Sequence, residues 1–208
     1  MNESLREDAV VILKAAIDRV DPSSMIRRCV SVADDRLTIV TETESVEIDL
    51  RPFQRIVVIG AGKASARIAR ALEEVLGERI ESGVVSVKPG HVDDVRRVKL
   101  VEAGHPVPNQ GSVDAAGAIM SLAADADEHT LVINAISGGG SALLALPFND
   151  GTTAITLEDM QGTTGALLAC GATIQEINTV RKHMSAIKGG RLAQALAPAT
   201  AVSLILSD

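Results

Sequence analysis

Three consecutive glycines flanked by two serines form the segment of this chain whose residue types best suit ligand chemistry. The segment follows an apolar run at residues 131–136 and precedes another at residues 142–144. Glycines leave their backbone N–H groups uncovered by a Cβ, and a helix starting there adds a partial positive charge. The pattern predicts a strand, a turn and a helix rather than the alternative, a flexible glycine–serine connector. The turn is expected to bind phosphate oxygens through Ser137, Gly138, Gly139, Gly140 and Ser141.

A lysine follows a second glycine turn, residues 60–62, which comes after the β-branched run at residues 55–59. A Walker A loop needs glycine at the position of Val57, so that phosphate-binding motif is excluded. A dinucleotide-binding motif needs an acidic residue after the next strand. The chain has Lys88 there, so NAD is disfavoured. Lys63 therefore follows the carboxyl end of a strand, where its charge can attract a carboxylate or a phosphate. The alternative is that Lys63 is an exposed lysine without a ligand.

The densest group of cations lies between residues 178 and 191, in a chain that is acidic overall. Helical spacing places Asn178, Arg181 and Lys182 on neighbouring faces, and Lys188 follows them. Such a set suits charge-assisted hydrogen bonds to a triphosphate or to an acidic substrate. A solvated basic face is the alternative.

A histidine lies in a loop, residues 103–109, that Pro106 and Pro108 hold extended. The loop follows an expected strand, so it is placed to line a pocket. His105 is interpreted either as a structural loop residue or as a substrate contact, and the sequence favours neither.

The composition of the chain excludes several classes of partner. Its 208 residues carry a net charge of −7, and its only aromatic residues are Phe53 and Phe148. A surface that binds nucleic acid or an anionic membrane is therefore not expected. A local group of N–H donors and cations is still able to bind a phosphorylated ligand. Neither a signal peptide nor a segment of transmembrane length occurs, so the expectation is a soluble, cytoplasmic protein.

The two cysteines, Cys29 and Cys170, are far apart and form no CxxC arrangement. A zinc site or a disulfide framework is therefore not expected, and both residues are expected to be reduced thiols. Cys170 is expected at a buried helix end, where a thiol is unreactive.

Apolar runs that alternate with helical periodicity predict the architecture. Helices are expected over residues 3–19, 63–76, 111–124, 156–170 and, with a break near 188–190, 174–197. Strands are expected at residues 55–59, 83–87, 98–101, 131–136 and 201–206, with an antiparallel hairpin outside the main sheet at 37–50. Strands alternating with helices imply a doubly wound, mostly parallel sheet with helices on both faces, which is an α/β/α sandwich.

The closing strand, residues 201–206, has the apolar composition of a central strand, and Ser207 and Asp208 follow it. Ligands of open α/β sheets bind at the carboxyl edge, where these two residues are expected. A strand in this position lacks its crossover helix. The sequence is therefore expected to be part of a longer protein, with the sandwich incomplete at the C-terminus.

Six stretches, taken in order, resemble the glycerate 2-kinase family, whose members carry a C-terminal MOFRL domain. They are IGAGKA (59–64), GHPVP (104–108), SGGGSALL (137–144), EINTVRKH (176–183, with Ser185), KGGRL (188–192) and LILSD (204–208). Each stretch alone is a weak signal, and their order along nearly the whole chain makes the resemblance specific. It implies that residues 1–208 form an N-terminal α/β domain of a glycerate kinase, without the MOFRL domain.

The resemblance further implies ATP- and Mg²⁺-dependent phosphorylation of D-glycerate to 2-phosphoglycerate. In that reading Lys63 meets the substrate carboxylate or the transferring phosphoryl group, and Arg181 balances negative charge. Asp208 contacts Mg²⁺ or acts as a base toward the substrate hydroxyl. The nucleotide is expected to bind residues 137–141, Asn178, Lys182 and Lys188. The implied partners are D-glycerate and the missing C-terminal domain, with a homodimer allowed and neither nucleic acid nor membrane expected.

Three other readings stay open. An NAD-dependent oxidoreductase uses the same kind of sheet, but the acid that binds the ribose is missing here. A non-catalytic phosphosugar-binding module also places Ser/Gly loops on phosphates, and it needs neither ATP nor Mg²⁺. A truncated product that folds poorly, because its last strand is uncovered, is expected to unfold with low thermal cooperativity.

Overall fold

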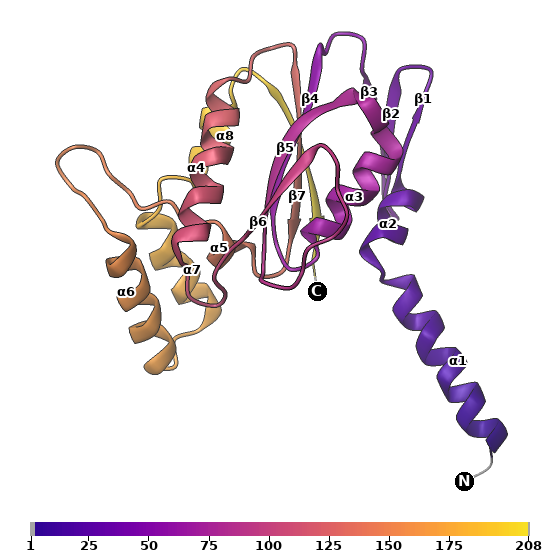
Figure 1. The fold of residues 1–208 in the computed structure, drawn as a ribbon, viewed down its shortest axis with the longest axis horizontal. Helices are drawn as coiled ribbons and strands as arrows, with labels where there is room; N and C mark the ends of the chain where they lie inside the picture. Colours follow the sequence, from indigo (N-terminus) through magenta and orange to yellow (C-terminus); the bar gives the residue numbers. More distant parts are fainter. Residues whose placement is uncertain (1–2, 208) are drawn as a thin grey trace.

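A computed structural model describes residues 3–207 of the chain, and a five-stranded parallel sheet forms its centre (Figure 1). The strands are β4 (Arg55–Ala61), β5 (Ile80–Val87), β6 (Val98–Glu102), β7 (Thr130–Ser137) and β8 (Thr200–Leu206). They lie in the order β6-β5-β4-β7-β8, and each neighbouring pair is parallel. Valine and isoleucine are frequent in β4, β5 and β7, as expected for strands that are buried on both faces.

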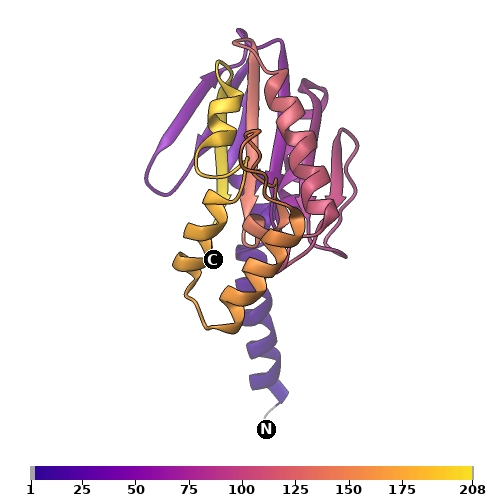
Figure 2. The same ribbon diagram turned by 90° about the vertical axis from the view of Figure 1, so that its left-hand side faces the viewer.

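Helices cover both faces of this sheet (Figures 1 and 2). α3 (Ser65–Leu76) packs on one face, where it also contacts α2 (Pro22–Cys29). α4 (Gln110–Ala124) and α8 (Arg191–Leu196) pack on the other face. Each face has its own apolar cluster, with fully buried side chains such as Leu72 and Ile119. The expected α/β/α sandwich is therefore confirmed.

A second, antiparallel sheet packs beside α3. It consists of β1 (Val30–Ala33), β2 (Arg36–Val40) and β3 (Ser45–Asp49), in that order. Leu37 and Ile39 of β2 are buried in the same apolar cluster as α3. The hairpin expected at residues 37–50 is confirmed as lying outside the main sheet, and β1 is a third strand that the sequence did not predict.

The other helices pack less closely on the sheet. α1 (Glu3–Arg19) forms where its periodicity predicts it, and it extends from the body with every residue exposed (Figure 2). α6 (Leu157–Ala169) and α7 (Ile174–His183) contact each other, and both begin at capping boxes. Among the described residues, no helix combines the length and apolar character needed to cross a bilayer.

β8 lies at the edge of the sheet within residues 3–207, and its Ile205 is 68% exposed, so its expected place as a central strand stays a prediction. One local expectation is wrong. Cys170 is exposed rather than buried, because the helix that it follows packs against α7 and not against the sheet.

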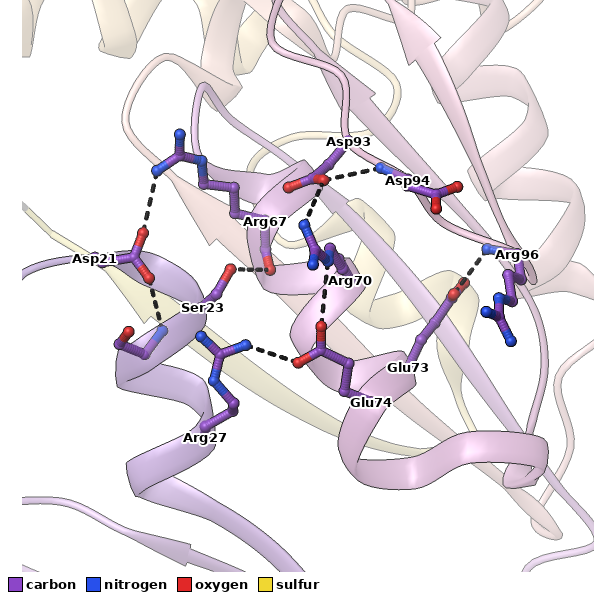
Figure 3. Close-up of polar contacts among 11 residues, drawn as sticks. Asp21, Ser23, Arg27, Arg67, Arg70, Glu73, Glu74, Asp93, Asp94 and Arg96 are labelled. Atoms are coloured by element: carbon purple, nitrogen blue, oxygen red, sulfur yellow. Dashed lines mark hydrogen bonds and ion pairs between the residues drawn. The ribbon is translucent and has the colours of Figure 1, made fainter. Parts of the chain in front are cut away.

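An ion-pair network fastens α2 and the loop before β6 to α3 (Figure 3). Glu74 accepts hydrogen bonds from Arg27 at 2.7 Å and from Arg70 at 3.2 Å, and Arg70 also donates to Asp93 at 3.0 Å. The hydrogen bond from Arg27 is the main reason that the pKa of Glu74 lies below its ordinary value. These pairs are exposed and each contributes under about 1 kcal/mol, so they orient the elements more than they stabilise them.

Glu73 makes a stronger connection from the same helix. Its carboxylate accepts three successive backbone N–H groups where β6 begins, from Arg96 at 2.7 Å, Arg97 at 2.8 Å and Val98 at 2.9 Å. Hydrogen bonds to a charged group are stronger than neutral ones, and an N–H group that loses its acceptor is costly. Glu73 therefore sets the position of β6, which leads directly into the loop that carries His105.

We expect Glu73→Ala to destabilise the fold, because three N–H groups lose a charged acceptor. The expected loss is about 2 kcal/mol of unfolding free energy, or about 6 °C in Tm, measured by thermal denaturation with circular dichroism. Glu78→Ala is the matched control, since that carboxylate belongs to a side chain that is 97% exposed. It should change stability by less than about 0.5 kcal/mol. Equal losses in the two variants would contradict the role given to Glu73.

Candidate functional site

The two glycine turns lie at the same edge of the main sheet. β4 and β7 are neighbours, although β5, β6 and α4 separate them along the chain. From this pair the connections run outward in opposite directions, through α3 on one face and α8 on the other. Open α/β sheets bind their ligands at the carboxyl ends of the strands beside such a switch in strand order. β4 ends at Ala61 and β7 ends at Ser137, and the two glycine turns that follow them therefore lie at this point.

Glycine is required where the two turns meet. A Cβ on Gly60 would lie 2.1 Å from the carbonyl oxygen of Ala135. A Cβ on Gly62, whose φ is +150°, would lie 2.0 Å from Oγ of Ser137. Both distances are far shorter than a van der Waals contact. The ends of β4 and β7 therefore approach this closely only because the sequence has glycine at both positions.

The hydroxyl of Ser137 holds the two turns together. It accepts the N–H of Ala64 at 3.0 Å and shares a hydrogen bond with the Ser65 hydroxyl at 3.0 Å. A further bond joins the N–H of Lys63 to the carbonyl of Gly138 at 3.0 Å. The sequence suggests Ser137 as a phosphate-binding residue. Because its buried hydroxyl is already bonded within the turns, the side chain positions the site rather than facing a ligand.

The glycine segment itself offers free hydrogen-bond donors. The N–H groups of Gly138, Gly139 and Gly140 have no protein acceptor within residues 3–207. Gly139 has a φ of +89°, and Gly140 begins α5 (Gly140–Leu143), which is a single turn. The helix expected after this turn is therefore present but short, and its dipole adds little. Uncovered N–H groups of this kind are suited to binding anions.

Four of the predicted side chains lie around this segment. The side chain of Lys63 is exposed, and its Cε lies 3.3 Å from the place that a Cβ on Gly139 would occupy. Ser141, Arg181 and Lys188 border a common space of about 10 Å³, about the size of one water molecule. The fold thus brings cations from the β4 turn and from the region of α7 toward one glycine segment.

The environment of these cations disfavours their charged forms. Nη2 of Arg181 donates to the carbonyl of Pro106 at 3.0 Å, and burial lowers the pKa of this guanidinium. Nζ of Lys188 donates to the carbonyl of Leu144. Burial, and after it the charge of Arg181, lowers the pKa of Lys188 from 10.5 to about 8. A bound anion would counter both effects, so the site favours anionic ligands.

His105 also belongs to this site, although the sequence left its role undecided. A Cβ on Gly139 would lie 3.0 Å from both Cδ2 and Nε2 of the ring, so the imidazole lies against the glycine segment. Burial is the main cause that lowers the pKa of His105, and the charges of Lys63, Lys88 and Arg181 lower it further. Only the proline-rich loop pointed to His105 in the sequence. Nothing in the local pattern pointed to Lys88.

Three predicted residues are not part of this cluster. Asn178 and Lys182 are exposed on α7, and neither side chain forms a hydrogen bond or ion pair within residues 3–207. Asp208, expected as a metal ligand or a base, lies outside the described residues. The described part of the chain contains no group of three or more His, Cys, Asp or Glu side chains that is able to hold a metal ion.

Known proteins resemble this chain in sequence and in structure. The D-glycerate 2-kinase of Thermotoga maritima is 38% identical over 99% of this chain and 44% of its own length. A protein of Agrobacterium vitis, named provisionally as a hydroxypyruvate reductase, is 50% identical over 74% of this chain and 39% of its own length. A crystal structure of a Pyrococcus horikoshii protein matches 100% of this chain and 45% of that one, with a TM-score of 0.83 and 40% identity.

The chain thus spans less than half the length of each of these relatives. The family model described as "Domain of unknown function (DUF4147)" matches residues 8–208, which include the whole parallel sheet and both glycine turns. The chain therefore belongs to the DUF4147 family.

Proposed function

We propose that this chain is the N-terminal α/β domain of a glycerate 2-kinase, which transfers a phosphoryl group from ATP to D-glycerate in the presence of Mg²⁺. The observation that carries the proposal is the glycine segment beside Lys63 at the switch point, with free N–H groups and surrounding cations. Such a site suits an anion with several phosphate oxygens. The name of the Thermotoga relative supports the same reaction.

The residues at the site fit the phosphates of ATP. The N–H groups of residues 138–140 and the hydroxyl of Ser141 are donors for phosphate oxygens, and Lys188 supplies charge. Mg²⁺, when bound, neutralises phosphate charge, and it is usually held by phosphates, water and one or two carboxylates. We assign Asp208 as its carboxylate ligand. Asn178 and Lys182 are assigned to the nucleotide from α7, with smaller effects because both are exposed.

The residues of this chain would promote phosphoryl transfer by positioning and by charge. Lys63 lies against Gly139, so its ammonium group can contact the substrate carboxylate or the transferring group. The carbonyl of Pro106 holds Arg181, which orients the guanidinium before any ligand binds. Groups that are oriented in advance stabilise the transition state without reorganising.

A hydroxypyruvate reductase is the second candidate, because the Agrobacterium relative has that provisional name. Binding of a nicotinamide dinucleotide usually needs an acidic residue at the end of the second strand, where it bonds the ribose. Here β5 ends at Val87 and Lys88 follows, so this position has the opposite charge. We therefore favour the kinase.

Phosphorus NMR tests the proposal directly, with ATP, Mg²⁺ and D-glycerate. Two samples are needed, namely the chain alone and the chain joined to the part of the Thermotoga relative that lies outside the match. A 2-phosphoglycerate resonance together with ADP is the expected result. No product from either sample, when both are folded, would contradict the kinase. Oxidation of NADH by hydroxypyruvate in the same samples would favour the reductase instead.

In the sample that turns over, Lys63→Ala should lower kcat about a hundredfold, because one transition-state contact is worth roughly 3 kcal/mol. Its Tm should stay close to that of the wild type, since the side chain is exposed. Lys99→Ala, at an exposed lysine on the edge strand β6, is the control and should keep full activity. Activity of Lys63→Ala within a fewfold of wild type would show that this lysine has no catalytic role.

Two serine variants separate positioning from ligand binding. Ser137→Ala should lower the unfolding free energy by about 1–2 kcal/mol, because the N–H of Ala64 loses its buried acceptor. Ser141→Ala should leave stability within about 0.5 kcal/mol but weaken ATP binding about tenfold, a loss of about 1.4 kcal/mol. Thermal denaturation and titration calorimetry measure the two effects. If Ser141→Ala lowered stability and Ser137→Ala weakened ATP binding instead, Ser141 would be the positioning residue and Ser137 the ligand-binding one.

The affinity for ATP should fall as the pH rises through about 8, where Lys188 loses its proton in the free protein. An anion favours the charged amine, so binding above this pH should take up a proton. Calorimetry in buffers of different ionisation enthalpy measures that proton between about pH 7 and about pH 9.5. Lys188→Arg stays charged over the whole range and should remove the proton uptake. An unchanged uptake in this variant would place the titrating group elsewhere.

A further inference from the structure

We propose that His105 is the base of this site, and that it accepts the proton of the D-glycerate hydroxyl during phosphoryl transfer. The proposal rests on the kinase function given above, and it adds the residue that deprotonates the nucleophile. It leaves Asp208 as a ligand of Mg²⁺.

His105 is held in a braced loop beside the glycine segment. The loop lies between β6 and α4, and the N–H of Gly104 donates to Oδ1 of Asn109 at 2.8 Å, across its base. On the other side of His105, the carbonyl of Pro106 accepts a hydrogen bond from Arg181, which lies on α7. Hydrogen bonds from two directions therefore fix the backbone on both sides of His105. A group held in this way keeps its geometry when a substrate binds.

The ring of His105 is free to bind a ligand. His91, His129 and His183 each have Nδ1 at 3.2, 3.3 and 2.7 Å from a backbone carbonyl oxygen. His105 is partly buried, yet neither of its ring nitrogens has a hydrogen-bond partner within the part of the chain that the structure describes. Both ring nitrogens are therefore available to a ligand, and a hydroxyl group is a suitable hydrogen-bond partner for either of them.

The ring nitrogen lies where the expected ligands meet. Nε2 of His105 and Cε of Lys63 both contact the space next to Gly139, at 3.0 and 3.3 Å from a Cβ built there. Gly139 is also the middle residue of the three whose N–H groups are free, Gly138 to Gly140. A substrate whose carboxylate meets Lys63 has its hydroxyl within reach of the imidazole, because only one or two bonds separate the two groups in a hydroxy acid.

Burial, and after it the positive charges that face His105, favour the neutral form of its ring. These charges are Lys63 from the turn after β4, Lys88 from the end of β5 and Arg181 from α7. Together with burial, they lower the pKa of His105 below its ordinary value of 6.5. A neutral imidazole can accept a proton near pH 7, whereas an imidazolium cannot. The carboxylate of bound glycerate offsets part of the cationic charge, so the proton affinity of the ring rises when the substrate is present.

The proposed step conserves atoms and charge. The O–H bond of the glycerate hydroxyl breaks, and its proton moves to Nε2 of His105. The hydroxyl oxygen forms a bond to the γ-phosphorus of ATP. The bond from that phosphorus to the β–γ bridging oxygen breaks, and its electron pair stays on ADP. His105 then releases the proton to solvent and becomes neutral again.

His105→Gln is the test variant, because glutamine keeps hydrogen-bonding groups but does not accept a proton near pH 7. In the sample that turns over, kcat should fall about a hundredfold, while KM for D-glycerate changes only a fewfold. The decline of kcat/KM on the acidic side, where His105 becomes protonated, should disappear as well. His129→Gln, at the opposite edge of the sheet, should keep the wild-type profile. Retention of the acidic limb in His105→Gln would overturn the proposal and leave the kinase function intact.

A second readout needs no turnover. Long-range proton–nitrogen NMR of the histidine rings in this chain, with His105→Gln to identify the signal, follows Nε2 during titration with D-glycerate. Binding should shift the Nε2 signal and raise the pKa of His105, and the His129 signal should not move. An Nε2 signal that D-glycerate leaves unchanged would overturn the assignment. A shifted signal without any 2-phosphoglycerate would count against the kinase and support His105 as a hydroxy-acid contact.

Discussion

The close contact between the ends of β4 and β7 is the constraint on which the site depends. Two glycines allow the backbones to meet, and the Ser137 hydroxyl then bonds the first turn to the second. Any side chain at Gly60 would push against the Ala135 carbonyl in the centre of the sheet. Because the turns are joined through the sheet itself, the backbone of Lys63 is held at a defined position beside the glycine segment.

The charge of the site is opposite to that of the whole chain. The net charge is −7, yet Lys63, Lys88, Arg181 and Lys188 gather near one segment. Several carboxylates outside the site accept hydrogen bonds that stabilise helix and strand ends. Glu73 holds the start of β6, and capping boxes engage Asp159 and Glu176 at the starts of α6 and α7. An acidic protein can therefore present a cationic site, because its carboxylates are engaged in places where they do not neutralise it.

Local patterns predicted most of the fold and part of the site. Periodicity and apolar runs were sufficient to predict the parallel sheet. The local density of cations singled out Arg181 and Lys188, which the fold places around one small space, and their roles stay predictions. The position of β8 depends on which strands lie beside it, and the bonding of Ser137 depends on groups more than 70 residues away. Such long-range contacts leave no trace in a local pattern. Asn178 and Arg181 lie one helical turn apart on α7, so the sequence does not distinguish them. Only Arg181 bonds the loop that carries His105, whereas Asn178 is exposed, and this difference follows from how α7 packs.

The cations that suit an anionic ligand also act, after burial, to favour the neutral form of His105. Burial is the first cause that lowers the pKa values of Lys188, Arg181 and His105, and neighbouring positive charges lower those of Lys188 and His105 further. Burial acts in the same direction on all three groups, because it disfavours their charged forms. An anion that enters reverses the electrostatic part of this effect, and the protonated forms become more favourable. Ligand binding and proton binding are therefore coupled at this site. In the proposed reaction the imidazole of His105 becomes a better proton acceptor when an anionic substrate is in place, so the cation cluster would link the binding of the substrate to its deprotonation.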